Sequence, residues 1–317
     1  MDELFSIDPD QTFLRREAVA AGYNDADLRR ACRDGIIVRV RQGAYAPAAV
    51  WAAADDVRRH QLRAHAVLRT HASGIALSHT SAAVEHGLRV HRLNLDKVHV
   101  VCLDRKVART TPDIVYHDGS RHEDFVVPVE GRPCVAPVRA GLEAASLCDV
   151  ASGLVLLDSL IDLRKGTLDE LHRSFAGFTR VPGSRKLQIT VRLTRKGSQS
   201  VGESLGRYVM FRQGLPAPRL QYEVRDASGN LIGICDYAWP GYGLLGEFDG
   251  MSKYGRLRKE GETPGQAVER EKVREDKLRE ATQFLMIRIT WRELFDERRL
   301  GYRIRTQLDR GRRLVAA

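Results

Sequence analysis

The first fifty residues alternate between helical and strand-like spacing of their apolar positions. Gly22 ends a first helix, and Asn24 caps a second one that has acidic residues in its first turn and arginines in its last. A β-branched segment then turns at Gln42-Gly43 and resumes. The predicted elements are helices at 13–20 and 25–33 and strands at 36–41 and 44–46. Two helices followed by a hairpin is the order of a winged helix.

In the middle of the chain, the spacing of apolar residues predicts helices on either side of a group of short strands. The predicted helices are 51–71, 80–86, 138–148, 154–163 and 168–178. The predicted strands are 97–103, 113–117, 125–129 and 187–193. The polar stretch 194–198 that follows is typical of a connection between domains.

The last third predicts a helix, three strands, a charged helix, a fourth strand and a final helix. Val201, Leu205, Tyr208 and Val209 form the apolar stripe of the first helix. The strands are predicted at 221–225, 231–238, 244–249 and 284–291, and the charged helix at 269–280. The whole pattern predicts an α/β (α+β) protein with a winged helix at 1–49, a mixed middle domain at 50–195 and a mixed sheet flanked by helices at 196–317.

Composition changes this picture mainly through charge. The chain has 317 residues and a formal net charge of +10, which favours a polyanionic partner. It contains no apolar run of about 18 residues, and its acidic start lacks the features of a signal peptide. We therefore expect no membrane partner and a cytoplasmic protein. The five cysteines form no CxxC, and the ten histidines show no ligand-like spacing, so we expect neither to bind a metal.

Three acidic residues in the last third are the strongest candidates for chemistry. Glu247 and Asp249 alternate along a predicted strand and share a face, and Asp236 lies on the neighbouring strand. Converging carboxylates suit Mg²⁺ or Mn²⁺, which can activate water for phosphodiester hydrolysis. Lys253 follows closely and could stabilise developing charge. The alternative is that these are surface acids on an exposed edge, although a carboxylate that interrupts an apolar strand is costly.

Glu203 has two interpretations. Ser200-Val201-Gly202-Glu203 matches a capping box, in which the glutamate returns to the start of its own helix. Alternatively, the helix delivers Glu203 to the metal as a fourth carboxylate. A match to GxGxxG at 241–246 leads into a strand rather than a helix, so we interpret it as hairpin glycine.

Arginines gather on the predicted winged helix. Arg29, Arg30 and Arg33 lie on its second helix, and Arg39 and Arg41 lie on its hairpin. Such arginines can pair with phosphates and read guanine edges. The alternative is a solvated face on a protein-interaction domain. A second basic stretch near the end could steer a polyanion; it comprises Arg298, Arg299, Arg303, Arg305, Arg310, Arg312 and Arg313.

The N-terminal residues resemble the winged helix of AbiEi-type antitoxins. The resemblance is carried by residues 28–35 and 38–45, and residues 78–83 and 98–100 resemble the middle region of that family. It implies a winged helix that binds operator DNA and represses a type IV toxin–antitoxin operon, with a cognate toxin as a further partner.

The C-terminal residues resemble Vsr-like endonuclease domains of the PD-(D/E)XK superfamily. The matching segments are Ser200-x-x-Glu203-Ser204, Gly214-Leu215-Pro216-x-Pro218, Gln221, Asp236-x-x-Trp239-Pro240, Glu247-Phe248-Asp249-Gly250-x-x-Lys253-Tyr254, Glu271-Lys272-x-Arg274-Glu275-Asp276 and Arg288-Ile289-Thr290-Trp291. The resemblance implies a restriction-endonuclease-like sheet in which Glu203, Asp236, Glu247 and Asp249 form the site, with Gln221 and Lys253 nearby. One departure is Asp249, which stands where the superfamily has lysine.

Together these observations predict a DNA-binding protein with a Mg²⁺-dependent endonuclease domain. The alternative is a non-enzymatic repressor or antitoxin of the AbiE-like type that uses the C-terminal domain for binding. Action on RNA is a third possibility.

Overall fold

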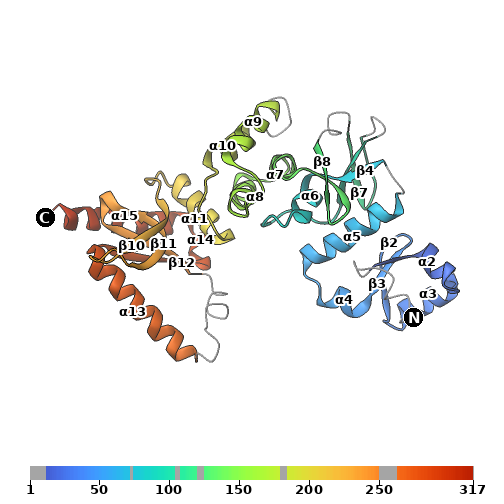
Figure 1. Ribbon diagram of the computed structural model, residues 1–317, viewed down its shortest axis with the longest axis horizontal. Coiled ribbons are helices and arrows are strands. Elements are labelled where there is room, and N and C mark those ends of the chain that lie inside the picture. The colour runs from blue at the N-terminus through green and yellow to red at the C-terminus, as the bar shows by residue number, and fades with distance from the viewer. Residues whose placement is uncertain are drawn as a thin grey trace. The chain divides into compact units, whose positions relative to one another are not determined.

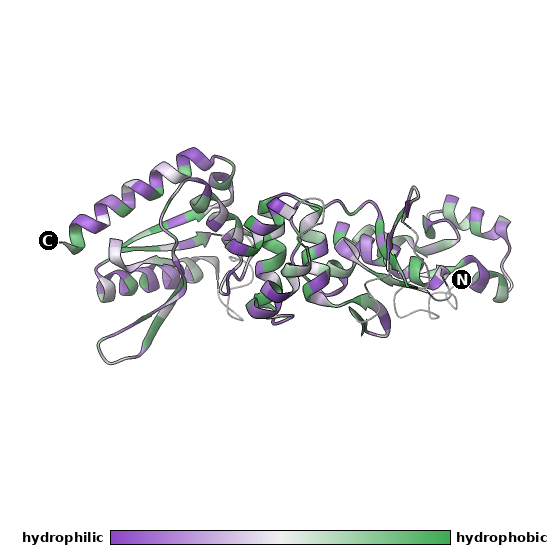
Figure 2. Ribbon diagram, turned by 90° about the horizontal axis from the view of Figure 1, so that it is seen from above, coloured by the Kyte–Doolittle hydropathy of each residue, from purple (hydrophilic) through white to green (hydrophobic). Residues whose placement is uncertain are grey.

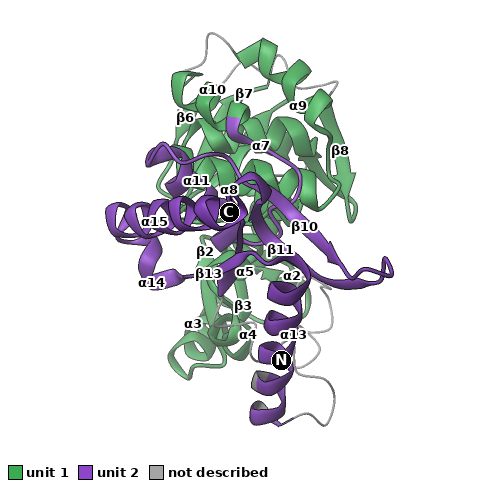
Figure 3. Ribbon diagram, turned by 90° about the vertical axis from the view of Figure 1, so that its left-hand side faces the viewer, with its two compact units in different colours: residues 1–192 green, residues 193–317 purple. Residues whose placement is uncertain are grey.

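The computed structural model describes residues 12–71, 74–103, 108–119, 125–178, 184–249 and 263–316. The chain divides into two compact units, unit 1 (1–192) and unit 2 (193–317), which are coloured separately in Figure 3. The predicted mixed α/β class is confirmed. No helix in the described part of the chain has the length and apolar character needed to span a membrane.

Unit 1 begins with a small helical pair and a three-stranded sheet (Figure 1). Its elements are β1 (Phe13–Leu14), α2 (Arg15–Ala20), α3 (Asp25–Arg33), β2 (Ile37–Arg41) and β3 (Ala44–Pro47), with the sheet order β1-β3-β2. Asn24 caps α3 as expected, because its side chain accepts hydrogen bonds from the backbone nitrogens of Ala26 and Asp27. The helical prediction for 13–20 is wrong at its start, since Phe13 and Leu14 pair with β3 instead.

The next part of unit 1 is a mixed six-stranded sheet with helices against it. The elements are α4 (Ala48–Ala53), α5 (Asp56–Thr70), β4 (Ile75–Leu77), α6 (His79–Glu85), β5 (Val98–Cys102), β6 (Arg109–Thr110), β7 (Ile114–Asp118), β8 (Val126–Val129) and β9 (Arg132–Val135). The strand order is β6-β7-β5-β4-β9-β8. The single helix predicted at 51–71 is divided, because Asp55 caps a new helix with its side chain.

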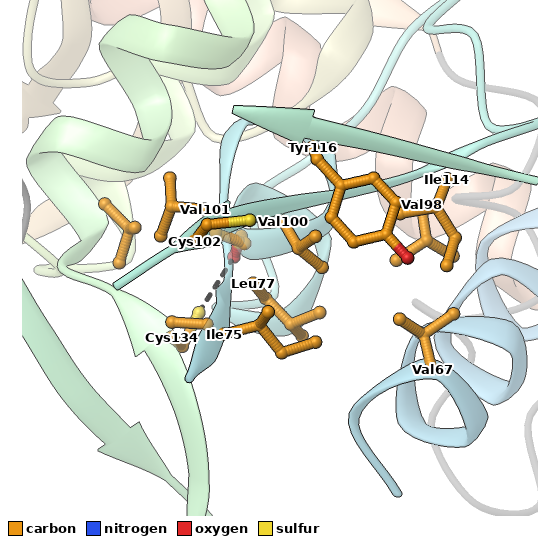
Figure 4. Close-up of a cluster of buried hydrophobic side chains, with 14 of the residues drawn as sticks. Val67, Ile75, Leu77, Val98, Val100, Val101, Cys102, Ile114, Tyr116 and Cys134 are labelled. Carbon is orange, nitrogen blue, oxygen red and sulfur yellow. Dashed lines mark hydrogen bonds between the residues drawn. The ribbon is translucent and has the colours of Figure 1, made fainter. Parts of the chain in front are cut away.

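The core of this sheet is built from aliphatic side chains of neighbouring strands (Figure 4). Val98 and Val100 of β5 lie with Tyr116 of β7 over Leu77 of β4, and each of these side chains is buried. Val67 adds the contact from α5. This packing holds β5 and β7 side by side.

Four helices complete unit 1: α7 (Pro137–Ser146), α8 (Val150–Asp162), α9 (Leu168–Phe175) and α10 (Ser184–Leu193). The strand predicted at 187–193 is wrong. Leu187 and Val191 are buried one helical turn apart and pack with Leu156 and Leu160 of α8. The β-branched residues there favoured a strand locally, but burial at helical spacing decides the structure.

Unit 2 has a four-stranded sheet of order β10-β11-β12-β13. Its elements are α11 (Val201–Arg212), β10 (Arg219–Arg225), β11 (Leu231–Trp239), β12 (Leu244–Asp249), α13 (Pro264–Thr282), β13 (Leu285–Thr290), α14 (Trp291–Leu294) and α15 (Glu297–Val315). The first three strands are antiparallel, whereas β12 and β13 run parallel. The C-terminal helix α15 is largely hydrophilic in Figure 2 and buries Leu300, Ile304 and Leu308 on one side.

Candidate DNA-binding surface and carboxylate cluster

The exposed face of α3 meets the hairpin of β2 and β3 in a shallow groove. Its volume is about 350 Å³, and it is lined by Leu28, Arg29, Cys32, Arg33, Arg39 and Tyr45. The guanidinium-bearing residues Arg29, Arg33 and Arg39 are all exposed. These three arginines lie on elements that pack on one small apolar core under α3. In this core Tyr45 stacks on Phe13 with ring centroids 5.5 Å apart. We define Arg29, Arg33 and Arg39 as the groove arginines.

The other two predicted DNA-binding arginines lie elsewhere. Arg30 is exposed but does not line the groove. Arg41 has only 12% of its side chain exposed, and its Nε donates to Asp113 Oδ2 at 3.0 Å. Its guanidinium also donates to Thr70 Oγ1. Arg41 therefore connects the hairpin to the following sheet and helix, a structural role that its sequence position did not indicate.

The carboxylates predicted in unit 2 lie on adjacent strands. Tyr237 of β11 faces Gly246 of β12, which places Asp236 next to Glu247 in the antiparallel register. Asp236 Oδ2 accepts a hydrogen bond from the backbone nitrogen of Phe248 at 2.8 Å. Asp249 ends β12, where it faces Thr290 of β13. Lys253 lies outside the described residues.

Glu203 is buried at the start of α11, with 3% of the residue exposed. Its Oε2 accepts from the backbone nitrogen of Gln199 at 2.8 Å, while its own backbone nitrogen donates to Ser200 Oγ at 3.2 Å. Ser200 thus caps the helix as predicted, whereas the Glu203 carboxylate accepts from Gln199, the residue before the cap. Glu203 Oε2 also accepts from Nε2 of Gln221 at 3.3 Å, which connects the helix to β10.

Gln221 has an unusual backbone. Its φ is +48°, in the left-handed region that non-glycine residues seldom adopt. It lies between Leu220 and Tyr222, which face Tyr237 and Cys235, so Gln221 is beside Asp236. Strained backbone of this kind is concentrated at functional sites. Glu203, Gln221, Asp236 and Glu247 therefore follow one another across three strands and a helix.

A network of arginines and acids surrounds Glu247. Arg274 of α13 binds Glu247 Oε1 at 2.5 Å and Glu271 Oε1 at 2.7 Å. Arg288 of β13 binds Glu271 Oε1 at 3.1 Å and Glu275 Oε2 at 2.8 Å. Burial raises the pKa of Glu247 above its ordinary value, and the attraction of Arg274 opposes that rise only in part.

The four predicted carboxylates do not form a ready ligand set. In the described part of the chain, the only group of three or more His, Cys, Asp or Glu residues whose ligand atoms lie within 4.8 Å of one another consists of His79, His99 and His117. Arg274 occupies the position next to Glu247 instead. A divalent cation bound by Asp236 and Glu247 would compete with this guanidinium for the Glu247 carboxylate.

The histidine group was missed by analysis of the sequence. Its members are distant along the chain and have no ligand-like spacing, so we expected them to be scattered. The periodicity of the strands carrying His99 and His117 was visible, but the neighbouring position of those two strands was not.

Comparisons with known proteins bear on the N-terminal residues. Residues 1–48 match a family model described as "Transcriptional regulator, AbiEi antitoxin". This confirms the predicted resemblance for those residues, whereas nothing supports the Vsr-like endonuclease prediction for unit 2.

Two curated relatives are the uncharacterized proteins MT2308 and Rv2248 of Mycobacterium tuberculosis, strains CDC 1551 / Oshkosh and ATCC 25618 / H37Rv. Each is 27% identical over 187 residues, which is 58% of this chain and 65% of the relative. The chain thus spans just under two thirds of the length of these relatives. The crystal structure of the RV2827C protein from Mycobacterium tuberculosis is similar with a TM-score of 0.37 and 15% identity, covering 62% of this chain and 80% of that one.

Proposed function

We propose that the chain is a DNA-binding transcriptional regulator of the antitoxin kind, which contacts duplex DNA through α3 and the β2–β3 hairpin. The observation that carries the proposal is the groove arginines, which combine two exposed cations on a helix with a third on a hairpin. An exposed helix fits the major groove of B-DNA, which is about 12 Å wide. The hairpin arginine would then lie against the adjacent phosphates.

The family match gives independent support, because the matched residues contain α3 and the whole β2–β3 hairpin. It also supports a cognate toxin as a second partner in this proposal. The alternative is that this surface binds another protein. Salt dependence distinguishes the two, because binding through phosphate contacts weakens strongly as salt rises and a surface that binds only protein should not show this effect.

The direct test is fluorescence anisotropy with the full chain and labelled duplexes. One duplex carries the DNA upstream of the chain's own gene, and the other has the same composition in shuffled order. A regulator should bind the first at least tenfold more tightly at a fixed salt concentration. Equal, weak and strongly salt-dependent binding to both would indicate nonspecific attraction to a basic protein, and no binding would refute the proposal.

A second candidate function is phosphodiester hydrolysis by unit 2 with Mg²⁺ or Mn²⁺. It is favoured by the position of Asp236 next to Glu247 and by the strained Gln221 beside them. Against it stands the ion pair of Glu247 with Arg274, so the carboxylates as placed do not fit a bound cation and we assign no hydrolytic step. RNA is included among the substrates to be tested.

The test combines metal binding with cleavage. Mg²⁺ or Mn²⁺ should raise the melting temperature in proportion to site occupancy, and Asp236→Asn should reduce that rise. Cleavage of single- or double-stranded DNA or RNA by the wild type, but not by Asp236→Asn, would establish the enzyme. Metal stabilisation without cleavage would leave a binding domain, and no metal effect in either protein would eliminate the site.

A further inference from the structure

Three histidines from separate elements meet on one side of the six-stranded sheet. His79 begins α6, His99 lies in β5 and His117 lies in β7. Each offers a ligand atom, and these atoms all lie within 4.8 Å of one another. His99 Nδ1 is 2.9 Å from His117 Nε2, and the rings of His79 and His117 stack with centroids 3.6 Å apart.

The sheet itself sets two of these positions. In the parallel pairing of β5 and β7, His99 faces Val115 and His117 faces Val101. Because alternate residues share a face, the two histidines are diagonal neighbours on the same side. The intervening Val100 and Tyr116 point into the core shown in Figure 4, which keeps both strands in register.

His79 is held over the same spot by contacts outside the sheet. Its φ is +47°, a left-handed conformation in which its own ring lies beside the other two. Oε2 of Glu143 in α7 is 3.4 Å from His79 Nδ1 and accepts from the His79 backbone nitrogen at 3.3 Å. Glu143 is only 4% exposed and is fixed in turn by Arg139, whose Nε donates to Oε1 at 2.9 Å.

We propose that His79, His99 and His117 bind a Zn²⁺ ion, with Glu143 orienting the His79 ring from outside the coordination shell. Three imidazoles are a donor set that suits zinc and other late transition metals rather than Mg²⁺ or Ca²⁺. A buried carboxylate beside a ligating histidine is the usual outer partner at such sites. With three protein ligands, a fourth position is open to water or to a further ligand.

The local chemistry agrees with this assignment. All three residues are partly buried rather than sealed, which leaves a route for an ion. Tetrahedral zinc with bonds of 2.0–2.1 Å requires nitrogen atoms about 3.3 Å apart. Because a metal lies in the plane of each ligating imidazole, the stacked rings of His79 and His117 have to rotate when they bind it.

The competing explanation is a stack of neutral imidazoles joined by a hydrogen bond. The two explanations differ in their response to metal. A stack requires no cation, whereas a zinc site should take up one equivalent with high affinity. The histidine group shares no residue with the groove arginines or with the unit 2 carboxylates.

The test uses the tag-free full chain, treated with a chelator that is then removed. Calorimetric titration with Zn²⁺ should give one site per chain, and Co²⁺ should produce the strong visible absorption of a tetrahedral complex. His117→Gln should weaken Zn²⁺ binding at least tenfold, because a ligand is lost. The matched control is His172→Gln, which changes an exposed histidine of α9 outside the group and should bind zinc normally.

Two further variants sharpen the result. Glu143→Gln retains all three ligands and should weaken binding 10–100-fold through the outer shell. Asp236→Asn should leave zinc binding unchanged, which separates this site from the unit 2 carboxylates. Absence of the cobalt spectrum in the wild type overturns the proposal, even if His117→Gln does not fold. Zinc binding of equal strength in wild type, His117→Gln and His79→Gln overturns it as well.

Discussion

The groove arginines give a prediction with a calculable magnitude. Replacing Arg29, Arg33 and Arg39 together with alanine removes three exposed cations without touching the core, since all three side chains are on the surface. If each pairs with one phosphate, the slope of log affinity against log salt should flatten by about 0.9 for each contact, or about 2.7 in all. A fourfold rise in salt should then cost the variant roughly 40-fold less affinity than it costs the wild type.

The assay is anisotropy with duplex DNA between 50 and 200 mM salt, the range over which such slopes are measured. The matched control replaces Arg173, Arg185 and Arg192 with alanine. These arginines are also exposed, but they belong to α9 and α10, so the control removes the same charge from other elements. The control should retain most of the wild-type slope, because only a small long-range effect of net charge is lost.

Equal slopes in the two triple variants would refute the reasoning, because net charge rather than the groove would then determine binding. Two single variants refine the assignment. Arg30→Ala should have a smaller effect than Arg29→Ala, because Arg30 does not line the groove. Arg41→Ala should lower stability rather than change the salt slope, because its guanidinium binds Asp113 and Thr70.

Three further predictions concern unit 2. Gly202→Ala should destabilise the protein by about 3 kcal/mol or more in urea melts, because the added Cβ would lie 2.0 Å from the Phe248 ring, whereas Gly241→Ala meets nothing within 4 Å and should not. Glu203→Gln should change stability by less than about 1 kcal/mol, since its amide oxygen can still accept the backbone hydrogen bond; a metal ligand role would instead appear as lost Mg²⁺ stabilisation. The pKa of Glu247 is higher in the folded protein than its ordinary value of 4.5, so the folded state holds this proton more tightly than the unfolded state does. The contribution of Glu247 to the free energy of unfolding therefore falls as pH rises above 4.5. The free energy of unfolding of Glu247→Gln should therefore increase relative to that of the wild type as pH rises above 4.5. If the difference between the two proteins does not vary with pH, the pKa of Glu247 is not raised.

Much of the local structure could be predicted from the sequence because it depends on nearby residues. The cap at Asn24, the helix α3 and the hairpin that follows it all appear at the expected positions. The apolar stripe of α11 was visible for the same reason, since residues three and four apart share a helix face. The division of the chain into domains at 49 and 195 stays a prediction.

The errors arose where tertiary contacts override local preference. Phe13 and Leu14 had helical spacing, yet a partner strand was available at β3 and they pair with it. Residues 187–193 are rich in β-branched side chains, but packing against α8 buries Leu187 and Val191 at helical spacing. The local pattern of one sequence predicts neither the pairing of residues 13–14 with β3 nor the packing of residues 187–193 on α8. In both cases the partner lies far along the chain.

The candidate sites also combine features that follow from local sequence with features that depend on tertiary contacts. The sequence by itself determined that Glu247 and Asp249 share a strand face and that Asp236 lies on the preceding strand, because alternation is a local property. Only the tertiary structure decided that Arg274, 27 residues after Glu247, forms an ion pair with it. His99 and His117, 18 residues apart, likewise meet only because β5 and β7 are neighbours in the sheet. Spacing along the chain encodes which face a side chain takes, whereas strand order and helix packing, which depend on the whole core, decide which side chains meet.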